Sequence, residues 1–253
     1  MYLVYYYKAD TINPSNNEGA WLPAESTTKS LKGAGFTLYQ GPPYFGSFPI
    51  DFQVVGNLNS GTQTIGLKVE SGAPLANRGW NLVPNPYPCS LDWGAIKNSN
   101  PHLDASFYIL DNETWKSHNG SLGTANNFIP PGQSFFVKTS SSTSLTLTEA
   151  MTTVASSPTR FKQNIKNLEL EVSSQGTEAI KTWIAFDSKF SWGFDKTFDG
   201  LSKFNPGDSS SNLSSTDSTG EWLVFNGLPT ENKDQVIDLE FSSPILGAFQ
   251  LSI

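Results

Sequence analysis

The residue types that most often act as bases or nucleophiles are rare in this chain, which has two histidines and one cysteine. His102 follows an Asn-Pro pair and His118 precedes an Asn-Gly pair, so both are expected in turns. No Gly-x-Ser-x-Gly elbow occurs, and the histidines lack the helical spacing of metal ligands. Cys89 is expected to be a packed, inert thiol. A nucleophile–histidine–acid set that assembles only in three dimensions stays open.

Carboxylic acids offer a second chemistry, because glycoside hydrolysis needs two carboxyl groups about 5–10 Å apart. Asp92, Asp104, Asp111 and Glu113 fall within one stretch of the N-terminal half. Their spacing does not distinguish them from solvated acids in turns. A secreted carbohydrate-active hydrolase that uses these acids is therefore the alternative function for the chain.

Two further acids suggest a cation site. Asp195 and Asp199 lie four residues apart, and with Asp187 or Asp208 they would offer the oxygen ligands that Ca²⁺ prefers. The spacing does not match the Asp-x-Asp-x-Asp-Gly loop, and such side chains also accept backbone N–H groups in tight turns. Calcium is the only cofactor that the sequence suggests, and Asp195 and Asp199 are its candidate ligands.

Seven tryptophans are the remaining candidates, because aromatic faces on a β-sandwich can stack against sugar rings. Trp115 is the best exposed candidate, since the residues around it are polar. Tyr87 and Trp93 follow as ligand-binding candidates in a proline-rich loop. Three other tryptophans fit apolar strand patterns and are predicted core residues: Trp80, Trp183 and Trp222.

Composition narrows the class of partner. The 16 Lys and Arg against 23 Asp and Glu give a net charge of −7, so nucleic acids and anionic membranes are poor partners. No apolar run is long enough to span a bilayer, so no membrane insertion is expected. No glycine-rich phosphate loop occurs either. Charged residues are only 15% of the chain, which favours Ser-, Thr- and Asn-rich strands and turns over coiled coil.

Alternation with a period near two predicts strands almost throughout. The clearest helix signal is residues 90–97, with Ser90 as the cap. Residues 208–215 are predicted to form a polar loop. The predicted strands are residues 3–8, 35–39, 62–69, 107–110, 134–138, 144–148, 167–172, 182–186, 221–225 and 236–241.

These elements predict an all-β protein with two antiparallel β-sandwich, jelly-roll-like domains. The Ser- and Thr-rich stretch 152–159 contains Pro158 and is typical of a linker. We therefore place the domains at residues 1–158 and 159–253.

Two stretches in the first domain are similar to a known family. Gly79-Trp-Asn-Leu-Val-Pro-Asn-Pro-Tyr-Pro88, followed by Leu91-Asp-Trp93, resembles the GWNLVGNPYP…IDW module. Ile129-Pro-Pro-Gly-Gln-Ser-Phe-Phe-Val-Lys138 resembles its IPPGQGFFVK strand. The module occurs in large secreted and cell-surface proteins of bacteria with a type IX secretion system, often upstream of a C-terminal sorting domain. Weaker matches lie at residues 31–39, 55–61, 194–204 and 222–229.

The chain departs from this pattern at Pro84 and Ser134, where the module has glycines. Proline cannot adopt a positive φ, so the local turn at Pro84 is in question. Relative to the module, the chain lacks a first strand and a sorting domain, so we expect an N-terminally truncated fragment of a longer precursor.

The resemblance implies an extracellular or outer-surface location, a β-sandwich fold and no assigned catalytic mechanism. We expect a non-catalytic accessory or adhesive region with weak glycan binding. Its expected partners are cell-surface or environmental polysaccharide and other domains of the same precursor.

Overall fold

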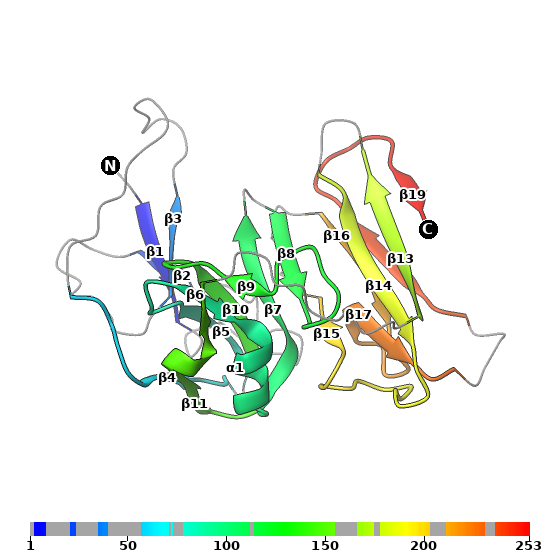
Figure 1. Cartoon of the computed structure of the whole chain (residues 1–253). Coiled ribbons are helices and arrows are strands. Elements are labelled where there is room, and N and C mark those ends of the chain that lie inside the picture. Colours follow the sequence, from blue (N-terminus) through cyan, green and yellow to red (C-terminus); the bar gives the residue numbers. More distant parts are fainter. Residues whose placement is uncertain are drawn as a thin grey trace.

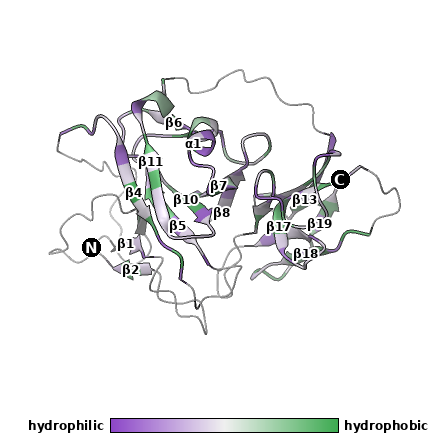
Figure 2. Ribbon diagram, turned by 90° about the horizontal axis from the view of Figure 1, so that it is seen from below, coloured by the Kyte–Doolittle hydropathy of each residue, from purple (hydrophilic) through white to green (hydrophobic). Residues whose placement is uncertain are grey.

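The computed structural model describes residues 3–8, 21–23, 35–39, 57–70, 72, 78–111, 114–154, 166–174, 178–202, 211–230 and 236–253. In this part the regular secondary structure is almost all β-strand, in mostly antiparallel sheets of the predicted sandwich type, with one α-helix. An N-terminal part and a C-terminal part lie side by side (Figures 1 and 2). The predicted boundary at 158/159 lies outside the described residues and stays a prediction.

The N-terminal part is built around a four-stranded antiparallel sheet in the order β5-β10-β7-β8. Its strands are β5 (Trp80–Pro84), β10 (Ser134–Thr139), β7 (Leu103–Asp111) and β8 (Thr114–His118). Pro84 ends β5 at the sheet edge, where a missing N–H costs no ladder bond, so the expected turn is replaced by a strand end.

Smaller sheets accompany this central sheet, in the orders β11-β4, β12-β6-β9 and β2-β1-β3. They comprise β1 (Leu3–Tyr7), β2 (Trp21–Pro23), β3 (Phe36–Tyr39), β4 (Gln63–Leu67), β6 (Ser90–Asp92), β9 (Phe128–Ile129), β11 (Thr143–Leu147) and β12 (Thr152–Thr153). A 3-10 helix covers Glu149–Met151.

The helix differs from its prediction. Helix α1 spans Trp93–Ser99, and Asp92 caps it by accepting the N–H of Ala95 at 3.3 Å. Ser90 instead begins β6, because the fully buried Leu91 is held between β12 and β9. The local capping signal was therefore displaced by sheet pairing.

The C-terminal part is a seven-stranded sheet in the order β18-β16-β17-β14-β13-β19, with β15 paired to β17. All pairings are antiparallel except β14 with β17. The strands are β13 (Lys166–Ser173), β14 (Ile180–Phe186), β15 (Gly200–Leu201), β16 (Asn212–Thr216), β17 (Trp222–Leu228), β18 (Leu239–Ser242) and β19 (Gln250–Ser252).

Two sequence predictions for this part are wrong in detail. Residues 208–215 were predicted to be a polar loop, but residues 212–215 belong to strand β16, where Leu213, Ser214 and Ser215 are buried. Trp222 was expected in the core but is 36% exposed at the start of β17. The core positions predicted for Trp80 and Trp183 are confirmed, since each is 3% exposed.

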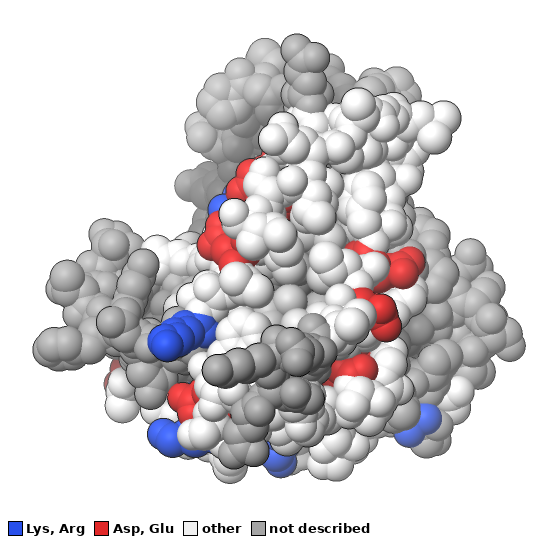
Figure 3. All heavy atoms as spheres, turned by 90° about the vertical axis from the view of Figure 1, so that its right-hand side faces the viewer, with Lys and Arg blue, Asp and Glu red and all other residues white. Residues whose placement is uncertain are grey.

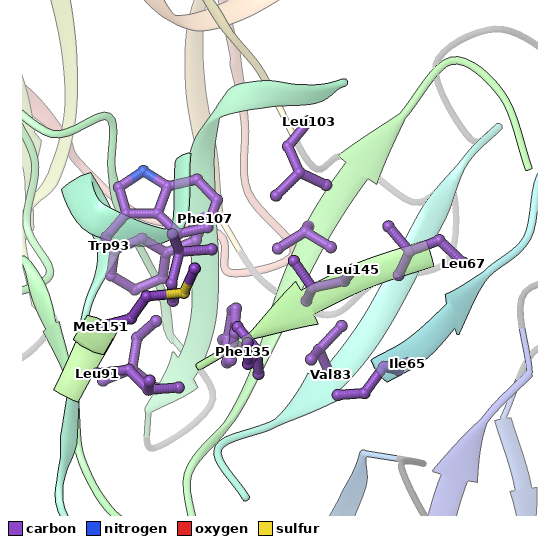
Figure 4. Packing of buried hydrophobic residues seen from close by; sticks show 14 of the residues in the cluster. Ile65, Leu67, Val83, Leu91, Trp93, Leu103, Phe107, Phe135, Leu145 and Met151 are labelled. Carbon is purple, nitrogen blue, oxygen red and sulfur yellow. The ribbon is translucent and has the colours of Figure 1, made fainter. Parts of the chain in front are cut away.

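One face of the central sheet carries the main hydrophobic core. The buried side chains on this face include those of Val83, Phe107, Phe135 and Val137. The indole ring of Trp93 joins the same cluster and contacts the rings of Phe107 and Phe135. Figure 4 shows these side chains meeting residues of β4, β6 and β11. The core is therefore the interior of a sandwich, with α1 closing one end.

The opposite face of the same sheet is also covered. Trp80 and Tyr108 lie in one buried cluster with Leu201 and Leu223 of the C-terminal part. Phe136 belongs to the same cluster and also packs against Tyr7 and Trp21 of the N-terminal part. Alternate residues of each strand thus enter two different cores, which explains why β7 is buried without interruption from residue 103 to 108. The two parts share an apolar layer.

The two parts are in close contact at Gly200. A Cβ atom there would lie 2.5 Å from Ser106 Oγ and 2.6 Å from the ring of Phe225. The absent side chain lets β15 pass between the central sheet and β17.

Candidate functional site

Asn85, the Asn of the Asn-Pro-Tyr-Pro sequence, holds the motif loop together. Its Nδ2 lies 2.9 Å from the carbonyl oxygens of Cys89 and Ile129 and 3.0 Å from that of Pro130. Its Oδ1 accepts the N–H of Tyr87 at 3.0 Å. The two motif stretches are therefore linked by this side chain as well as by the β5–β10 pairing.

The structure places two of the three candidate sugar-stacking residues in the core. Trp93 is fully buried and its Nε1 donates to Ala105 O at 2.8 Å. Tyr87 is 3% exposed, and its hydroxyl lies 2.7 Å from Gly61 O. Neither ring has a face open to a ligand. As a correction to the sequence analysis, both act in packing, because the proline-rich loop folds inward over the core.

Trp115, the third candidate, lies in β8 and lines a groove between the two parts of the chain. Its half-buried ring packs edge-to-face on Phe136, with centroids 5.5 Å apart. The cavity in this groove has a volume of about 50 Å³. Strands β7 and β8 form one wall, and β14, β16 and β17 form the other. Its polar lining includes Ser117, Thr124, Ser202, Ser211 and Asn212.

Each of two lysines at the groove contacts two carboxylates. Lys116 Nζ lies 2.6 Å from Asp111 Oδ2 and 3.4 Å from Glu178 Oε1. The hydrogen bond to Asp111 raises the pKa of Lys116, so its ammonium stays charged at neutral pH. This pairing also joins β8 to Glu178 of the C-terminal part.

Lys181, on the opposite wall, has its own two carboxylate partners. Its Nζ contacts Glu169 and lies 3.1 Å from Glu171 Oε2. Hydrogen bonding to Lys181 lowers the pKa of Glu169, and Trp183 Nε1 also donates to this carboxylate at 3.0 Å. Four carboxylates thus contact the two lysines that line the groove, and Glu178 is the one among them that also lines it.

The candidate acids for hydrolysis have other partners. Asp92 caps α1 and accepts a 3.1 Å bond from Asn127 Nδ2. Asp111 pairs with Lys116. Glu113 lies outside the described residues. Among the described acids of this stretch, Asp92 and Asp111 therefore do not form the pair of carboxyl groups that hydrolysis needs.

Asp104 is the unusual member of that set. It is 9% exposed, and burial raises its pKa to about 6, against the opposing effect of nearby lysines. One of these, Lys138, is 8% exposed, lies 5.3 Å from the ring centroid of Trp80, and has its pKa lowered by burial to about 8. Asp104 was a candidate from the sequence, but Lys138 was not, and its only signal was a charged residue within an apolar strand.

The histidines and the cysteine stay apart from the groove. His102 lies in a turn as predicted, but His118 ends strand β8 and stacks on Phe107 at 6.3 Å. His118 Nδ1 also accepts the N–H of Gly120 at 2.7 Å. Cys89 is half-buried against the main core.

The candidate calcium ligands bind backbone instead. Asp199 is fully buried and accepts the N–H groups of Gly227 at 2.6 Å and Asp195 at 2.7 Å. Asp195 Oδ1 accepts from the N–H and hydroxyl of Thr197. Within the described residues, no three His, Cys, Asp or Glu side chains form a metal-binding group. Of the added ligands considered, Asp187 accepts the N–H of Lys189, and Asp208 lies outside the described residues.

Comparison with known proteins adds no assignment, since no family model, curated relative or solved structure matches the chain. Among the described residues, no helix has the length and hydrophobicity to cross a bilayer.

Proposed function

We propose that this chain is a non-catalytic accessory or adhesive region of a secreted or cell-surface bacterial protein, and that it binds carbohydrate in the Trp115 groove. The observation that carries the proposal is the groove itself. It combines an aromatic ring on its wall with hydroxyl and amide side chains, which is the chemistry of sugar recognition.

The extracellular location rests on the resemblance to the type IX secretion module. Its two most specific stretches are neighbours in the sheet, with Pro84 opposite Ser134 and Trp80 opposite Lys138. The surface chemistry also supports an adhesive role, because Figure 3 shows wide uncharged areas between scattered acidic and basic side chains.

A binding role fits the groove better than hydrolysis does. Glu178 is the carboxylate among the lining residues, and it lies 3.4 Å from Lys116 Nζ. Hydrolysis requires a second, unpaired carboxyl group about 5–10 Å away. The hydrolase alternative keeps a basis in Asp104, whose raised pKa is typical of a general acid, but this side chain is only 9% exposed.

A glycan array with a parallel hydrolysis assay tests the proposal. We expect binding without turnover, and Trp115→Ala should weaken binding about tenfold because it removes the stacking ring. Trp192→Ala is the matched control, since Trp192 is 37% exposed and lies away from the groove. An equal loss of glycan affinity in both variants would overturn the proposal. So would hydrolysis of the bound glycan that Asp104→Asn abolishes.

A further inference from the structure

The charges that flank the groove restrict which carbohydrates can enter it. Two ammonium groups, those of Lys116 and Lys181, line the groove. Each is already in contact with two carboxylates, so its charge is neutralised by neighbours. A sulfate or uronate group entering the groove would have to displace one of these carboxylates.

The local balance also opposes an anion. Asp111, Glu178, Glu169 and Glu171 supply four negative charges against two positive ones, which leaves a net local charge of −2 from these side chains. Charged groups within about 8 Å interact at physiological salt, so this excess acts on a group that enters the groove. The whole chain, with a net charge of −7, repels polyanions in the same sense.

We infer that the groove selects neutral oligosaccharides and rejects sulfated and uronate-containing ones. This inference rests on the proposed function, because it names the class of carbohydrate that the same groove takes. Trp115 supplies the stacking face, Ser202 and Asn212 supply neutral polar groups, and the paired carboxylates exclude acidic sugars. Ser202 Oγ lies 2.9 Å from Asn212 Oδ1, which fixes these two polar groups on the C-terminal wall.

The test compares neutral oligosaccharides with their sulfated and uronate counterparts on one array, using the whole chain. We expect signal from neutral glycans alone. The affinity of the strongest neutral glycan, measured by calorimetry, should change less than about twofold between about 20 and about 200 mM NaCl, since no ion pair is formed.

A charge-removal variant tests the cause of selection. Glu169→Gln combined with Glu171→Gln frees Lys181 and should admit the sulfated counterpart of the neutral glycan. The matched control, Glu240→Gln, removes an exposed acid on β18, away from the groove, and should not change selectivity. Melting temperatures verify that each variant is folded.

The outcomes separate the two proposals. Preference of the unsubstituted chain for sulfated or uronate glycans overturns the inference and leaves carbohydrate binding in place. Unchanged exclusion of the sulfated glycan by the folded double variant also overturns it, since the carboxylates would then not be the cause. Absence of binding to any glycan overturns the proposed function itself.

Discussion

The hydroxyl group of Tyr108 lies 2.7 Å from the carbonyl oxygen of Leu201 and joins β7 of the central sheet to β15 of the C-terminal part. Burial raises the pKa of this phenol, so it is a neutral donor at all moderate pH values. Tyr108→Phe leaves the carbonyl without this donor and should lower the free energy of unfolding by about 1–3 kcal/mol. Urea denaturation measures this loss, with the half-buried Tyr6→Phe as a control. An unchanged midpoint for Tyr108→Phe would contradict the assigned bond.

Gly200 should tolerate no side chain. Gly200→Ala places a Cβ atom within 2.6 Å of both Ser106 Oγ and the Phe225 ring, and overpacking of this kind costs about 1–3 kcal/mol. Thermal unfolding should show a lower midpoint. In the control Gly66→Ala, the Cβ meets no atom within 4 Å in strand β4, and the midpoint should stay equal or rise. A harmless Gly200→Ala would show that the two parts are packed less closely than described.

Asn85 should be necessary for the stability of the motif loop. Asn85→Asp keeps the acceptor for Tyr87 N–H but removes the donor to the carbonyls of Ile129 and Pro130, which should destabilise the chain by about 1–3 kcal/mol. Chemical denaturation provides the measurement. Asn59→Asp, which disturbs one exposed bond to Pro86, is the comparison and should change stability little. Equal effects at the two positions would refute this role.

Stability should fall as the pH rises from about 4 to about 7. The pKa of Asp104 rises from 3.8 to about 6 on folding and that of Asp199 to about 7, so the native state holds protons that the unfolded chain releases. Asp104→Asn removes one of these groups and should raise the melting temperature at neutral pH and reduce the slope. Calorimetry at several pH values measures both. As a control, Asp238→Asn at an exposed position should keep the original slope of melting temperature against pH. If Asp104→Asn also keeps this slope, Asp104 is not the source of the pH dependence.

Much of the strand content was predictable because single-face burial leaves a period of two. The run 144–148 alternates, and β11 places Leu145 and Leu147 in the main core with one residue's difference in bounds. The run 134–138 was predicted from its apolar content, and β10 is buried on both faces. For β10 the prediction therefore depended on the strand preference of its apolar residues, since a strand buried on both faces shows no alternation.

The groove was only partly predictable. Trp115 was identified from its polar neighbours, but Lys181 and Asn212 join it from strands far along the chain. Nothing in the spacing of these residues encodes that meeting, since it follows from packing between the two parts. Tyr87 and Trp93 were misjudged for the same reason, because the fold of the proline-rich loop decides which side of an aromatic ring meets water.

The central sheet has no solvent-facing side over much of its length, and this has a consequence for dissecting the protein. A polypeptide that ends shortly after residue 154 would leave Trp80 and Tyr108 without Leu201 and Leu223, which share their buried cluster. This N-terminal fragment would expose an aromatic surface, and we expect it to aggregate or to bind another protein through that surface. We therefore expect the two parts to unfold together and to give one calorimetric peak on heating.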